Sequence, residues 1–150
     1  MELKKLMVDS KAAWIDFPGL NGFSVEVVNL SRKELTGIRK KCTTNKFDRR
    51  TRQLTESLDE DKFVEEFASK SIKNWRGLKL KYVESLLLID AANEDPEKEL
   101  PYSKDNCETL VQNSNEFDTW LNEVVFDLDN FRKEPTTGSD KPTGKTVQKS

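Results

Sequence analysis

The hydrophobic spacing of this chain changes near Ser31, from a period of two residues to the period of a helix. Before that point two extended runs, residues 11–17 and 23–30, flank a turn containing Pro18-Gly19 and Asn21-Gly22. At the beginning of the second run, apolar residues occupy alternate positions, as in a half-buried strand. They are Phe23, Val25 and Val27. We therefore expect a small antiparallel β element here, with residues 2–8 as a candidate third strand.

After Ser31 the apolar residues predict helices. Ser31 and Glu34 have capping-box spacing before a short helix that ends near Cys42. The same spacing at Ser57 and Glu60 precedes an apolar stripe, which predicts a helix from Asp59 to Trp75. Gly77 ends that helix, and an apolar segment follows from Leu78 to about Ile89.

Two further helices are predicted near the C-terminus. Ser103 is the expected N-cap of the first, and Ser114 or Asn115 that of the second. The second has a broad apolar face at helical spacing: Phe117, Trp120, Leu121, Val124, Val125, Leu128 and Phe131. Most of this face is expected to pack in the core, and its excess width leaves room to bind another helix.

The predicted fold is mainly helical (α+β): a bundle of about five helices with a small N-terminal antiparallel β element. Residues 43–58 are polar and basic and are expected to form a loop anchored by Phe47. We place one globular domain at residues 1–131. Residues 132–150 are expected to be a flexible, disordered basic tail, because Val147 is the only aliphatic residue there.

Composition argues against several chemistries. The chain has no histidine, which excludes Ser-His and Cys-His nucleophile pairs and removes the commonest metal ligand. Its two cysteines, Cys42 and Cys107, match no zinc-ligand spacing and are expected to be reduced and partly buried. The acidic run at residues 91–100 lacks the spaced ligands of an EF-hand, and no phosphate-binding glycine loop is present. We expect no enzyme activity, no cofactor and no metal.

Charge and hydropathy bear on the partners. The net charge of −2 divides into −5 for residues 1–131 and +3 for the tail, so the body disfavours nucleic acid. An acidic body would instead complement a basic client protein. No apolar stretch is long enough for a membrane span, and the N-terminus lacks a signal-peptide core. We therefore expect no membrane association.

Several short motifs, taken in order, resemble one family. They are the Trp14-to-Leu20 entry, the strand that starts at Gly22, Trp75-Arg76-Gly77-Leu78 after a helix, Pro101-Tyr102-Ser103 before another, and Phe117-to-Leu121 near the end. Over residues 10–131 this order is similar to the tail assembly chaperones of long-tailed, siphovirus-like bacteriophages.

The resemblance implies a non-enzymatic, phage-encoded factor of the host cytoplasm that is absent from the mature virion. Such chaperones bind the tape measure protein, keep it soluble and help recruit tail tube subunits. Two alternatives stay open. One is a structural tail or head-tail completion protein, and the other is a regulator that binds nucleic acid through Lys46 to Arg52 or the basic tail.

Two sets of residues are candidates for contacts. An apolar groove for a client helix would use Trp75, Leu78, Tyr82, Phe117, Trp120 and Leu121, for each of which core packing is the competing interpretation. Homo-oligomers, open and helical if head-to-tail contacts do not close, would form through an unpaired strand edge at Phe23, Val25 and Val27.

Overall fold

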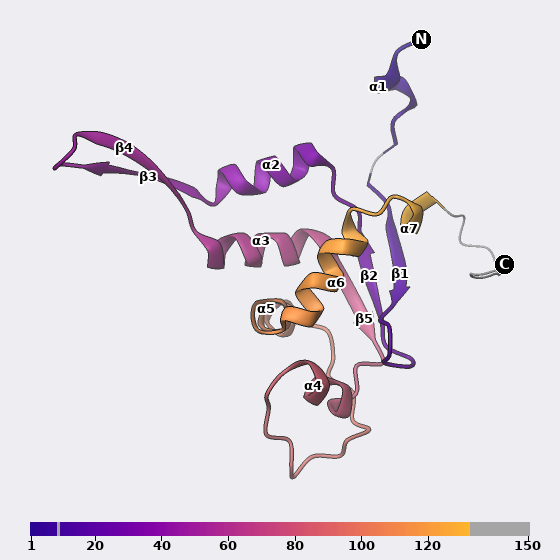
Figure 1. The fold of residues 1–150 in the computed structure, drawn as a ribbon. Helices are drawn as coiled ribbons and strands as arrows, with labels where there is room; N and C mark the ends of the chain where they lie inside the picture. The colour runs from indigo at the N-terminus through magenta and orange to yellow at the C-terminus, as the bar shows by residue number, and fades with distance from the viewer. Residues whose placement is uncertain (9, 133–150) are drawn as a thin grey trace.

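The computed structural model describes residues 1–8 and 10–132 of the protein. At its centre is a three-stranded antiparallel sheet with the order β1-β2-β5, formed by β1 (Ala12–Asp16), β2 (Ser24–Val28) and β5 (Ile72–Arg76). Helices α3 (Glu60–Ser71) and α6 (Asn115–Val125) pack on this sheet, and α5 (Lys104–Asn113) packs on both helices (Figure 1).

The N-terminal β element forms as the sequence predicts. Gly19 and Gly22 adopt φ values of +86° and +87° in the turn, and the Phe17 amide donates to the Phe23 carbonyl at 2.9 Å. β1 and β2 then pair in register from Asp16 opposite Ser24. Alternation along β2 sends its apolar side chains into the core.

Helix capping also follows the sequence, with one exception. Helix α2 (Arg32–Lys41) begins with the Ser31–Glu34 capping box, and Ser103 and Ser114 cap α5 and α6. For α3 the cap is Asp59, which accepts a hydrogen bond from the Lys62 amide, so the predicted box at Ser57 is wrong.

The remaining elements lie around this body. They are α1 (Leu3–Leu6), α4 (Leu80–Leu86), α7 (Asp129–Arg132) and a hairpin of β3 (Thr43–Asp48) and β4 (Gln53–Leu58). In Figure 1 the hairpin extends from the ends of α2 and α3, and α1 stands apart at the opposite end of the molecule.

The predicted mainly helical bundle is therefore wrong. The described residues form a mixed α/β fold with seven helices and five strands in two antiparallel sheets. Residues 43–58 form a hairpin instead of a loop, and Leu3–Leu6 is helical instead of a strand. The third strand of the central sheet is β5, a segment for which the sequence predicted a helix.

Helix α3 stops at Ser71 because the next residues complete the sheet. Ile72 is extended at the helix end. Two exposed residues, Lys73 and Asn74, separate it from the next buried side chain, Trp75, and the pairing register shifts between Ile72 and Asn74. Pairing with β2 supplies the hydrogen bonds that the helix would have made.

Two further expectations concern the tail and the membrane. The predicted flexible tail lies, apart from Arg132, outside the described residues. Across 1–8 and 10–132, no helix has the length and apolar character needed to cross a membrane.

Candidate functional site

The six predicted partner-binding residues lie mostly in the core. Trp75, Leu78, Phe117, Trp120 and Leu121 are buried, and Tyr82 is half-buried. Phe117 and Trp120 share a cluster with Phe17, with ring centroids 4.9–5.9 Å apart. Their role in partner binding stays a prediction, since in this conformation most of their surface is already covered.

Trp75 and Tyr82 make separate structural contacts. The Trp75 indole Nε1 donates to the Leu100 carbonyl at 2.9 Å, and its ring meets Tyr102 edge-on at 5.2 Å. The Tyr82 hydroxyl donates to the Asn21 carbonyl at 2.7 Å, which ties α4 to the β1–β2 turn. The structure therefore does not bring these two side chains and the Phe117–Trp120 pair into one groove.

The predicted self-assembly residues also lie inside. Phe23, Val25 and Val27 are fully buried, and β2 is the middle strand, paired with β1 on one edge and β5 on the other. The unpaired edge on which that prediction depended is therefore absent from β2. Homo-oligomer formation itself stays a prediction.

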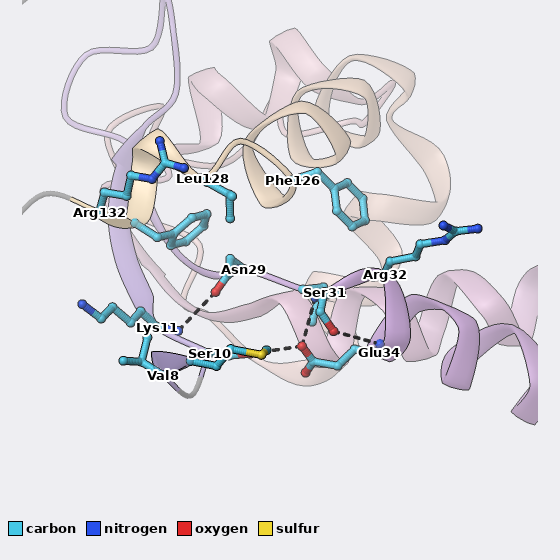
Figure 2. A pocket seen from close by; sticks show the side chains of 13 residues that line it. Val8, Ser10, Lys11, Asn29, Ser31, Arg32, Glu34, Phe126, Leu128 and Arg132 are labelled. Carbon is cyan, nitrogen blue, oxygen red and sulfur yellow. Dashed lines mark hydrogen bonds between the residues drawn. The ribbon is translucent and has the colours of Figure 1, made fainter. Parts of the chain in front are cut away.

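A groove of about 890 Å³ lies between the N-terminal arm and the end of α6 (Figure 2). One wall is the arm, residues 7–11 without residue 9, and the other is formed by residues after α6 and by α7. The floor is the β2–α2 connection. The lining side chains belong to Met7, Val8, Ser10, Lys11, Asn29, Leu30, Ser31, Arg32, Glu34, Phe126, Leu128, Phe131 and Arg132.

A hydrogen-bond network holds the arm against α2. The Glu34 carboxylate accepts from the Ser10 hydroxyl at 3.1 Å and from the Ser31 amide at 3.0 Å. The Ser31 amide, followed by the serine hydroxyls, lowers the pKa of Glu34 and keeps it ionised. Beside it, the Lys11 amide donates to the Asn29 side-chain oxygen at 3.2 Å.

The opposite wall exists because α6 ends early. The helix stops at Val125, so Phe126 and Leu128 leave the helical stripe and are 40% and 51% exposed. Phe126 packs against Phe67, with ring centroids 6.2 Å apart. The Asn130 side-chain amide donates to the Val124 carbonyl at 3.1 Å and fixes the turn that follows.

Charge around the groove is mainly positive. Lys11, Arg32 and Arg132 line it against one carboxylate, Glu34, which gives the lining a net charge of +2. Arg132 also pairs with Asp129 at 2.9 Å, an exposed contact of the kind that contributes little free energy. Exposed apolar side chains inside a basic rim suit an apolar segment flanked by acidic residues.

The thiols and possible metal ligands of the described chain do not gather at the groove. No cluster of three or more His, Cys, Asp or Glu side chains that could hold a metal occurs in the described part of the chain. The two thiols lie elsewhere and are buried, and burial raises the pKa of Cys107 to about 12. The exposed apolar side chains of its lining, Val8, Phe126 and Leu128, suit the groove to binding an apolar surface.

Sequence reasoning missed this groove. It assigned Leu128 and Phe131 to one continuous helix, placed Val8 in a candidate third strand and gave no role to Phe126. The available signal was the Asp127-Leu128-Asp129-Asn130 segment, whose Asp and Asn side chains favour turns over a continued helix.

Comparison with known families places this fold in a phage context. Residues 32–139 match the family described as YdaY prophage protein. The chain belongs to this family. The match supports the phage origin that the sequence resemblance implied, at a coarser level than tail assembly. No curated protein and no solved structure gave a significant match.

The YdaY match covers six of the thirteen groove-lining residues. It begins at α2 and includes the α2 side and the wall after α6, whereas the N-terminal arm and the floor at residues 29–31 precede it. It also spans the β3–β4 hairpin.

Proposed function

We propose that this YdaY-family protein is a non-enzymatic tail assembly chaperone of the host cytoplasm that binds a helical segment of the tape measure protein. The observation that carries the proposal is the groove beside the N-terminal arm. Val8, Phe126 and Leu128 expose apolar surface there, and Leu30 and Phe131 form its buried base. Soluble proteins rarely gather exposed apolar side chains in a concavity unless something binds there.

An amphipathic client helix has the matching chemistry. Side chains spaced at i, i+3 and i+4 would bury against Phe126 and Leu128, while the polar face of the helix would stay in solvent. Covering these residues removes apolar area from water, which is the main favourable contribution to such binding.

Because the rim of the groove is basic, we expect the client to carry acidic residues beside its apolar stripe. The net charge of the chain favoured a basic client, but charges beyond about 8 Å are screened at physiological salt. The local groups are therefore decisive, and the three basic residues Lys11, Arg32 and Arg132 outnumber the one lining carboxylate, Glu34. Carboxylates flanking the client's apolar stripe would pair with them.

This binding suits a temporary complex. A groove that covers one apolar stripe keeps a long helical protein soluble, and it releases the stripe when tail tube subunits compete for it. The resemblance to tail assembly chaperones supports this sequence of events, and family membership supports the phage origin.

The test is co-expression with the tape measure protein encoded in the same prophage. We expect wild-type protein to keep that partner soluble and to co-purify with it. Phe126→Asp and Leu128→Asp place a charge in the groove and should reduce the co-purified partner by about tenfold or more. Both side chains are substantially exposed, so circular dichroism should show folded variants.

Leu3→Asp is the matched control, because Leu3 is 74% exposed on α1 and does not line the groove. It should behave as wild type. Equal co-purification by all variants would refute the groove as the binding site. Recovery of the protein in purified virions at subunit stoichiometry would instead favour a structural tail or head-tail completion protein.

A further inference from the structure

The β3–β4 hairpin presents an apolar pair at its tip. The register places Phe47 directly opposite Leu54, so both side chains lie on the same face of the hairpin. They are 60% and 71% exposed. Figure 1 shows the hairpin standing clear of the rest of the fold, so nothing within the described chain covers this face.

The same tip is strongly basic. Residues 46–54 carry four basic side chains, Lys46, Arg49, Arg50 and Arg52, against one carboxylate. That carboxylate, Asp48, accepts a hydrogen bond from the Arg50 amide at 2.8 Å and so shapes the turn. The turn closes with Arg52 at φ +56°, a left-handed conformation that is uncommon for a side chain of this size.

A surface with the opposite properties lies on the same chain. Residues 84–99 carry six carboxylates and one lysine, a net charge of −5. Leu88, just after α4, is fully exposed among them. Within the part of the chain that the structure describes, Asp90, Asp95 and Glu99 form no salt bridge.

This acidic segment is held in place by the body. The Leu80 amide donates to the Lys98 carbonyl at 2.8 Å, and the Leu100 amide donates to the Leu78 carbonyl at 2.7 Å. Glu97 bridges Lys79 and Lys81, at 2.7 Å from each. The carboxylates of the acidic segment are therefore held in place, which lowers the entropy cost of ordering them when a partner binds.

We propose that the hairpin tip of one copy docks on the acidic segment of a second copy. Phe47 and Leu54 would cover Leu88, and the arginines would pair with Asp90, Asp95 and Glu99. Figure 1 shows the hairpin and the α4 loop on different sides of the molecule, so the contact joins different copies. Two unlike surfaces give a head-to-tail, heterologous association.

Nucleic acid fits the tip less well. A single strand is bound through a platform of aromatic faces, whereas Phe47 is here paired with an aliphatic side chain. The chain as a whole is also negative, at −2. The association proposed here is independent of the groove, since none of the groove-lining residues belongs to either surface.

Complementary charge swaps test the contact. The hairpin variant is Arg49→Glu with Arg50→Glu, and the acidic-segment variant is Asp95→Lys with Glu99→Lys. Sedimentation velocity and light scattering of the full-length protein should show association for the wild type, weakened by about tenfold or more in each variant alone. An equimolar mixture of the two variants should restore it, because each then offers the charge that the other lacks.

The matched control is Lys33→Glu with Lys40→Glu, an equal charge change on exposed positions of α2. It should associate as wild type. Phe47→Ala and Leu88→Ser should each weaken association several-fold without loss of helical signal, since both side chains are exposed.

Three outcomes would overturn the proposal. The first is a wild type that stays monomeric at about 100 µM, a concentration at which even weak complexes form. The second is unchanged association in both charge variants. The third is a mixture that fails to restore association, which means the tip binds some other surface. Salt-sensitive binding of an oligothymidylate probe by a monomeric wild type, lost in the Arg49→Glu, Arg50→Glu variant, would assign the tip to nucleic acid.

Discussion

Gly77 lies where the chain after β5 passes close to the backbone of Gly22 in the β1–β2 turn. Its φ is +75°, and a Cβ built on it would overlap the backbone of Gly22. Gly77→Ala should therefore lower the free energy of unfolding by about 2 kcal/mol or more, because both the backbone conformation and the contact become strained. Urea unfolding followed by tryptophan fluorescence measures this change.

Gly37 is the matched control for that substitution. It lies inside α2, where an added Cβ would meet no atom within 4 Å, and its φ is not positive. Gly37→Ala should stabilise the protein by about 0.5–1 kcal/mol, as expected for an exposed helix interior. If both alanine variants shift stability equally, the steric account of Gly77 is incorrect.

At the scale of elements, the sequence predicts a feature correctly where residues close together in the chain determine it. The boxes and caps at Ser31, Ser103 and Ser114 were identified correctly because a hydroxyl acceptor three residues before an amide is a local geometry. The turn at Gly19 and Gly22 was identified for a similar reason.

The errors arose where tertiary pairing decides the structure. Ile72 and Trp75 also fit a helical stripe, and only the presence of β2 beside them makes β5 a strand. Most side chains on both faces of the β3–β4 hairpin are polar, so no apolar residues with a period of two mark it in the sequence. The groove was missed because it joins segments about 120 residues apart in sequence.

The start of α2 should respond to pH through Glu34. Its pKa is lowered in the folded protein, chiefly by the Ser31 amide, so the stabilisation is present above about pH 4.5, the ordinary value, and is lost as the pH falls through the folded value. Glu34→Gln removes the titration and keeps the shape. At pH 6.5 the free energy of unfolding of the wild type should exceed that of the variant by about 0.5 kcal/mol, a size typical of exposed charge–dipole contacts.

The pH profile provides the control for Glu34. Urea unfolding of both proteins should show the difference shrinking as the pH falls below about 4.5. A difference that does not shrink as the pH falls would mean that the side-chain amide disrupts the capping box for a reason other than charge.

On the scale of the whole molecule, two of the surfaces that expose apolar side chains are built by different elements. The groove is formed where the N-terminal arm meets the end of α6, and the hairpin tip projects beyond α2 and α3 (Figure 1). The core residues come from the central sheet and its helices, and Leu58 is the hairpin's only side chain packed against them. The hairpin therefore contributes little to the folding of the body.

Removing the hairpin tip tests this division. Replacing residues 46–55 with an Asn-Gly dipeptide joins Asn45 to Glu56, which already face each other, through a two-residue turn suited to antiparallel strands. The midpoint of thermal unfolding should change by less than about 4 °C, the equivalent of roughly 1 kcal/mol. The shortened protein should keep the tape measure partner soluble, because its groove is intact, and should lose self-association. Loss of both activities in a folded protein would show that the two surfaces act as one.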